Sequence, residues 1–273
     1  MLDVAKPTSI DEAVHLAKTV SKLSPFVGNL IEYHTCGYLN ENPAFSPYGV
    51  WKRQDPGFPD TVFEGRIAPQ PGLEIKAWMP LATEITGRFK DSQKAFSQDN
   101  THVAVVAWLP AYVIFGKPQI IDVLIVTARS VAKARDDHYH NPPDYLVIEP
   151  QDTSSRTQNL QQTNTNGMKF QGTAKQFEAA KRVVESWGPP AQQYSTSATY
   201  QQRLRTLTAK FPYRGDTNYA KLDRIQHDEI ESFKERVCAM RYHGQTIAEW
   251  SRILASEDNS LIQNAVDCHI QIK

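Results

Sequence analysis

The amino-acid sequence predicts an α/β (α+β) fold, in which a buried sheet is flanked by helices. Three short apolar runs, HVAVVAWL, QIIDVLIV and DYLVIE, have the length and the β-branched content of buried strands. Apolar residues at helical spacing precede these runs near the N-terminus and follow them through the C-terminal third. Buried strands next to helices are typical of layered folds that share one core.

Composition limits the class of protein. The chain has 273 residues, of which 40% are hydrophobic and 22% charged, and this excludes collagen-like and low-complexity proteins. Thirty basic residues against thirty acidic ones give a formal charge of zero, which argues against a general polyanion binder but permits a local basic face. We expect a single domain over residues 1–273, because no linker of disordered composition interrupts the sequence.

Cysteine usage and hydropathy indicate the compartment. The three cysteines are far apart and form no CxxC pair, so neither a disulfide framework nor a zinc ribbon is expected. The N-terminus has no apolar core of a signal peptide. The longest apolar stretch, VAVVAWLPAYVIFG, contains Pro110 and is too short to span a bilayer. We therefore expect a cytoplasmic protein with no membrane partner.

The N-terminal region reads as two helices and a loop. Ser9 and Glu12 have the spacing of a capping box, and the apolar stripe that follows predicts a helix that ends at Pro25. A second short helix is predicted over 27–38. The next segment, NENPAFSPYGVWKRQDPGFP, is dense in proline, glycine and aromatic residues, so we expect an irregular loop.

Strands come next, and helices dominate the C-terminal third. TVFEG and LEIKAW are separated by RIAPQPG, which predicts two adjacent antiparallel strands. A helix over 128–137 is expected between QIIDVLIV and DYLVIE. Further helices are predicted over 177–187, before a Gly-Pro-Pro stop, and over 219–240 and 247–254.

A small group of charged residues accompanies the first two strands. Side chains alternate along a strand, so Glu74 and Lys76 share one face of LEIKAW while its apolar residues point to the other. If the preceding strand pairs with it, Asp60 approaches Glu74 near their common end. Two carboxylates are hard oxygen ligands for Mg²⁺, and a nearby ammonium can stabilise charge on a phosphate, which suits phosphodiester hydrolysis.

Pro59-Asp60 and Glu74-Ile75-Lys76 resemble the signature of the PD-(D/E)xK nuclease superfamily. This resemblance covers about residues 26 to 78. It implies a restriction-endonuclease-like fold, a mixed central β-sheet flanked by helices, with the metal-binding acids and the lysine on a central hairpin. Many members also use a glutamate on a preceding helix, and Glu32 in VGNLIEYH lies at a suitable distance upstream.

The resemblance also implies roles for individual residues. Its implied catalytic residues are Asp60, Glu74, Lys76 and Glu32. Its implied ligands for the Mg²⁺ cofactor are Asp60, Glu74 and the carbonyl of Ile75. Three nearby acids could replace Glu32, namely Asp55, Glu64 and Glu84. A surface hairpin whose charges are simply solvated is the alternative to a site.

A basic segment follows the strands. Residues 153–214 contain nine Lys or Arg but only two Asp or Glu, which lets a neutral protein hold a phosphate backbone locally. The segment begins with SSRTQNLQQTNTNGMKFQG, whose amide and cationic side chains can read adenine and guanine. We therefore expect a DNA-recognition excursion near 152–172, and a flexible polar loop is the alternative. Its leading candidates for base contacts are Asn164, Asn166, Lys169 and Gln171.

Within the superfamily, a chain of this size without a helicase P-loop or a methyltransferase glycine motif resembles a type II restriction endonuclease. That resemblance implies a member of a restriction-modification system that cuts double-stranded DNA at a short specific sequence and leaves 5′-phosphate ends. It also implies a homodimer, since two equivalent sites then face the two strands of a palindrome. A structure-specific repair nuclease of the same fold and a non-catalytic DNA-binding protein are the alternatives.

Overall fold

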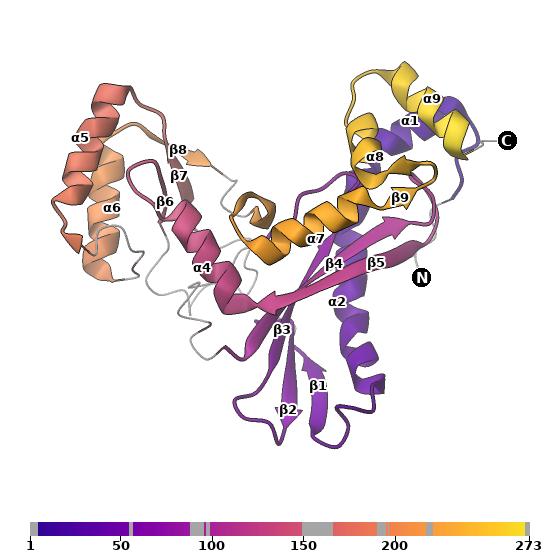
Figure 1. The fold of residues 1–273 in the computed structure, drawn as a ribbon, viewed down its shortest axis with the longest axis horizontal. Helices are drawn as coiled ribbons and strands as arrows, with labels where there is room; N and C mark the ends of the chain where they lie inside the picture. Colours follow the sequence, from indigo (N-terminus) through magenta and orange to yellow (C-terminus); the bar gives the residue numbers. More distant parts are fainter. Residues whose placement is uncertain are drawn as a thin grey trace.

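A mixed sheet of five strands forms the centre of the computed structural model, which describes residues 5–54, 57–87, 96, 99–148, 166–189, 195, 197–216 and 221–270. The strands lie side by side in chain order, as Figure 1 shows. β3 and β4 run parallel, and the other neighbours run antiparallel. The strands are β1 (Gly49–Arg53), β2 (Thr61–Gly65), β3 (Gly72–Trp78), β4 (Thr101–Pro110) and β5 (Pro118–Thr127). The predicted mixed α/β class is confirmed.

Helices cover both faces of this sheet. On one face, Ile31 and Leu39 of α2 (Ser24–Glu41) pack against the cluster that contains Ile75. On the other face, α4 (Ala128–Tyr139) and α7 (Asp228–Ala239) join the main core. Two short elements precede α2 in the chain, namely α1 (Ile10–Thr19) and η1 (Val20–Leu23). Further elements lie after residue 220, namely η5 (Leu222–Arg224), β9 (Arg241–Tyr242), β10 (Gln245–Thr246), α8 (Ile247–Leu254) and α9 (Asn259–Ile270). In the described parts of the chain, no helix has both the length and the apolar character needed to cross a membrane.

A second, three-stranded sheet has a hydrophobic core of its own. Its antiparallel strands β6 (Tyr145–Ile148), β7 (Asn166–Phe170) and β8 (Tyr213–Asp216) place β7 in the middle. α5 (Ala174–Glu185) and α6 (Ala198–Lys210) complete this core, in which Leu146, Phe170 and Leu204 are buried. The rings of Tyr139 and Tyr145, 4.9 Å apart, connect α4 to this sheet. The single-domain organisation stays a prediction.

The N-terminal helices differ from the sequence prediction at Pro25. The Ser9 hydroxyl accepts a hydrogen bond from the Glu12 backbone at 3.2 Å, as predicted, but the Glu12 carboxylate reaches the backbone of Thr8. Instead of ending a helix, Pro25 lies in the first turn of α2, directly after η1. Proline is tolerated there because the first backbone N–H groups of a helix have no partner within the helix.

The segment predicted as an irregular loop contains an edge strand. β1 pairs with β2, and this pairing places Trp51 opposite Phe63 with ring centroids 5.3 Å apart. The prediction failed here because turn-forming residues surround a run of only five strand residues. Contacts with residues that are distant in the sequence stabilise this strand, and a local sequence pattern does not reveal such contacts.

The C-terminal third is helical, but its boundaries differ. The helix predicted over 247–254 is confirmed as α8, whereas the helix predicted over 219–240 begins only at Asp228. The preceding segment is held against the loop after β3, because the backbone N–H of Leu222 donates to the carbonyl of Ile85 at 2.8 Å. Leu222 and Ile225 are buried although neither lies in an α-helix, because Leu222 belongs to the short 3-10 helix η5 and Ile225 follows it. α6 and α9 were not predicted.

Candidate active site

The hairpin of β2 and β3 brings the predicted signature residues into one place. Asp60 comes directly before β2, and the pairing of Thr61 with Leu73 places it beside the start of β3. Glu74 and Lys76 follow in β3, on the same face of the strand. Because β3 lies between β2 and β4, the hairpin is central in the sheet.

The contacts among these residues are short. The backbone N–H of Ile75 donates a hydrogen bond to Asp60 Oδ2 at 2.6 Å. Lys76 Nζ lies 2.5 Å from Glu74 Oε1 and 3.9 Å from Asp60 Oδ2. It also donates to the carbonyl of Ile75 at 3.0 Å. The ammonium therefore lies between the two carboxylates and draws them together.

Glu74 is buried, which contradicts the alternative of a hairpin with solvated charges. Only 1% of the residue is exposed, and among the described residues its Oε2 atom has no hydrogen-bond partner. Burial raises the pKa of Glu74, and the positive charge of Lys76 opposes this shift. A buried carboxylate oxygen without a partner is costly, so a ligand bound to this atom would remove that cost.

Lys76 keeps its charge in this environment. Burial acts to lower the pKa of Lys76, but the carboxylates of Glu74, Asp60 and Glu32 together raise it above its ordinary value. The side chain is 19% exposed, so solvent reaches part of it. A permanently protonated lysine can stabilise negative charge but cannot accept a proton.

Glu32 is brought to the same cluster by α2. Burial, followed by the negative charge of Asp60, raises the pKa of Glu32 to about 7, and Lys76 and Arg53 oppose the shift. This carboxylate therefore exchanges its proton near neutral pH. A role in proton transfer suits such a group, since an effective acid or base has a pKa near the working pH.

Two of the acids that could have replaced Glu32 have other partners. Glu64 lies 2.5 Å from Lys52 on the exposed side of the β1–β2 pair. Glu84 pairs with Lys221 and Arg224, away from the hairpin. Asp55 lies outside the described residues. Of the three acids that the structure describes, Glu32 is the one whose charge couples to Asp60, Glu74 and Lys76.

The oxygen atoms of the hairpin fit a Mg²⁺ ion by their chemistry. In the described part of the chain, no three His, Cys, Asp or Glu side chains form a group that could hold a metal. Magnesium needs fewer protein ligands, because it keeps several waters and takes one or two carboxylates together with substrate phosphates. The partnerless Glu74 Oε2, the Asp60 carboxylate and the Ile75 carbonyl supply oxygen donors of this kind.

The predicted recognition residues are only partly described. Asn164 lies outside the described residues, and only the backbone of Asn166 is described, at the start of β7. Lys169 is exposed on β7, and residues 166–170 form this strand and not the flexible polar loop that was the alternative. Gln171 follows the strand, and its side-chain amide donates to the carbonyl of Phe170 at 3.0 Å. These recognition residues stay predictions.

Sequence reasoning missed a glycine that shapes the site. A Cβ atom on Gly72, at the start of β3, would lie 2.6 Å from the ring of Pro59 and 3.2 Å from Thr101 Oγ1. Glycine at this position thus lets the segment before Asp60 pack against the strand that carries Glu74. The glycine at the end of the RIAPQPG turn is the signal that could have identified it.

Sequence and structure comparisons add no family to these observations. No protein-family model matches the chain, and comparisons with curated proteins and with solved structures give no match either. The likeness to a nuclease superfamily therefore rests on the signature residues and on their convergence at the β2–β3 hairpin.

Proposed function

We propose that this chain is a Mg²⁺-dependent nuclease that hydrolyses phosphodiester bonds of double-stranded DNA. The observation that carries the proposal is the position of Lys76 Nζ, 2.5 Å from Glu74 and 3.9 Å from Asp60, next to a carboxylate oxygen that has no partner among the described residues. Buried like charges are costly to fold, and catalytic sites are where such clusters concentrate.

The metal-binding part of the proposal concerns three oxygen donors. Asp60, Glu74 and the carbonyl of Ile75 would hold the ion. When bound, Mg²⁺ neutralises charge on the scissile phosphate and lowers the pKa of an attacking water.

The side chains of the protein supply the rest of the chemistry. Lys76 donates hydrogen bonds to phosphate oxygens as negative charge develops on them. Asp60 is held in place by the Ile75 N–H, so its carboxylate needs no reorganisation when substrate binds. The Glu32 carboxylate, with its pKa near 7, accepts the proton that the attacking water loses.

The arrangement of elements supports a restriction-endonuclease-like fold as part of this proposal. A mixed sheet carries the acids and the lysine on a central hairpin, and the helix before this hairpin contributes Glu32. We infer a type II restriction endonuclease of a restriction-modification system, which acts as a homodimer on a short specific sequence and leaves 5′-phosphate ends. The three free cysteines suit a reducing cytoplasm.

Incubation with plasmid DNA and MgCl₂ tests this proposal. Discrete fragments with 5′-phosphate ends, formed by the wild type but not by Lys76→Met, would support a site-specific nuclease. Cleavage confined to branched or flapped DNA would favour a repair nuclease of the same fold. Binding of DNA with no cleavage in any divalent cation would leave a non-catalytic protein. Glu64→Gln is the matched control, since it removes an exposed carboxylate of the adjacent strand.

A further inference from the structure

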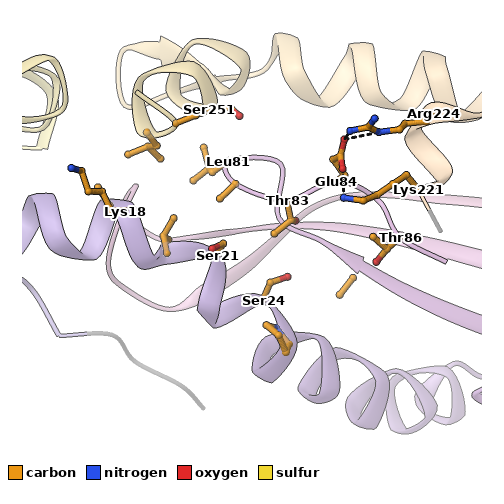
Figure 2. Close-up of a pocket in the computed structure, with 17 residues that line it drawn as sticks. Lys18, Ser21, Ser24, Leu81, Thr83, Glu84, Thr86, Lys221, Arg224 and Ser251 are labelled. Carbon is orange, nitrogen blue, oxygen red and sulfur yellow. Dashed lines mark hydrogen bonds and ion pairs between the residues drawn. The ribbon is translucent and has the colours of Figure 1, made fainter. Parts of the chain in front are cut away.

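A cavity of about 840 Å³ lies between the N-terminal helices, the loop after β3, η5 and the end of α8 (Figure 2). Ala77 of β3 contributes to its wall, whereas Glu74 and Lys76 do not line it. Its volume is within the range of about 300 to 1,000 Å³ that is typical of small-molecule sites.

Positive charge lies at both ends of this cavity. In Figure 2, Lys18 projects at one end, and Lys221 and Arg224 lie at the other end around Glu84. Arg224 Nη2 is 2.7 Å from Glu84 Oε1, and Lys221 binds the other carboxylate oxygen. The two cations thus share the Glu84 carboxylate, and the charge of Asp223, the residue before Arg224, also acts on both of them. At the other end, Lys18 has no acidic partner among the described residues.

The middle of the cavity offers hydroxyl groups. Ser21, Ser24, Thr86 and Ser251 line it, and within the described chain their hydroxyls form no side-chain hydrogen bonds. Leu81 adds an apolar surface between them. Free hydroxyls can both donate to and accept from a ligand. A matching ligand therefore has a polar, hydroxyl-bearing body between two anionic groups.

We propose that this cavity binds a small organic bisphosphate, in which a sugar-like spacer separates two phosphate groups. Lys18 pairs with one phosphate, Lys221 and Arg224 pair with the other, and the hydroxyls of the cavity bind the spacer. Hydrogen bonds from cationic side chains to phosphate are among the stronger polar contacts in proteins. The site is independent of the nuclease proposal, because it shares no side chain with it.

Titration of the protein with adenosine 3′,5′-bisphosphate at constant ionic strength tests this inference. Saturable binding by calorimetry is expected, together with a melting temperature that rises with ligand concentration. Inorganic phosphate, which can reach only one end, is expected to bind at least about tenfold more weakly. Lys18→Gln is expected to weaken bisphosphate binding about tenfold and to leave the melting temperature of the free protein unchanged, since Lys18 is exposed and has no ion-pair partner among the described residues.

Two matched controls separate this site from general electrostatics. Lys22→Gln removes an exposed lysine one helical turn away that does not line the cavity, and it is expected to bind like the wild type. Arg224→Gln is expected to weaken binding, whereas Arg236→Gln, which breaks a comparable ion pair with Asp122, is not.

Three results would overturn the inference. The first is the absence of saturable binding by the bisphosphate, and the second is an equal loss of affinity in Lys18→Gln and Lys22→Gln. The third is that short duplex DNA displaces the bisphosphate and that this displacement requires Lys18. The cavity would then hold a nucleic-acid strand.

Discussion

Asp60 Oδ2, directly before β2, accepts a hydrogen bond from the backbone N–H of Ile75 in β3 at 2.6 Å. This bond fixes the carboxylate against β3, where Lys76 lies 3.9 Å away. An acid that would otherwise turn toward water is thereby held beside another carboxylate. The hairpin thus keeps two negative charges and one positive charge in a fixed arrangement.

Gly72→Ala is expected to reduce DNA cleavage about 100-fold, since a small misplacement of a catalytic group has an effect of that size. The added methyl would lie 2.6 Å from the Pro59 ring, so the segment that holds Asp60 must shift. Initial cleavage rates measure the effect. Gly215→Ala, where nothing lies within 4 Å of the added atom, is the matched control. Full activity in Gly72→Ala would show that this packing does not position Asp60.

Lys76→Met is expected to destabilise the protein by about 3 kcal/mol at pH 8, because it leaves the buried Glu74 carboxylate without its cation. The double variant Glu74→Gln/Lys76→Met removes the buried charge as well and should recover most of this loss. Urea unfolding measures both. An additive double variant would contradict the coupling of the two residues.

Glu32→Gln is expected to stabilise the metal-free protein more at pH 8 than at pH 4.5. The pKa of Glu32 is raised from 4.5 to about 7 in the folded chain, so between these values the native state holds a proton that the unfolded state has lost. Stability therefore falls as pH rises through this window. Glu32→Gln has no carboxyl group at this position, so its stability does not fall with pH for this reason. Thermal unfolding in a chelator between pH 4.5 and 8 measures the difference, with Glu64→Gln as the control for the loss of one acidic charge. Parallel curves for Glu32→Gln and the wild type would contradict the assignment.

Lys169→Gln and Arg214→Gln are each expected to weaken DNA binding similarly across unrelated sequences. The two residues are cross-strand partners in β7 and β8, and both are exposed. Like charges directly opposite one another weaken a sheet, which suggests a role outside folding. If each contacts one phosphate, the slope of log affinity against log salt falls by about 0.9 per variant. Fluorescence anisotropy at several salt concentrations measures this, and Lys117→Gln is the control. Unchanged slopes would exclude a phosphate contact for these residues.

The hairpin of the candidate site could be predicted because its signals are local. Alternation along LEIKAW separates the charged face from the apolar one, and a turn rich in proline joins it to the preceding strand. The burial of Glu74 and the shifted pKa of Glu32 could not be predicted, since they depend on which helix covers the hairpin. Sequence spacing gave only the distance along the chain between Glu32 and Asp60.

The sequence-based predictions that the structure contradicts share a physical cause. β1 lies among turn-forming residues, and Leu222 has apolar character at helical spacing yet is buried in the short 3-10 helix η5 and not in an α-helix. In both segments, contacts with distant parts of the chain override the local preference. The ion pairs of Glu84 also could not be predicted from local sequence, because Lys221 and Arg224 lie more than a hundred positions after it.

The central claim concerns one carboxylate and is tested by Mg²⁺-dependent cleavage of duplex DNA by Asp60→Asn. The amide keeps the size of the side chain and an oxygen that can accept the Ile75 hydrogen bond, so the fold is expected to survive, as a melting curve will show. We predict that the wild type cleaves and that Asp60→Asn is at least about 100-fold slower at equal stability. A folded Asp60→Asn that cleaves at the rate of the wild type, or a wild type inactive on every duplex in Mg²⁺, would contradict it.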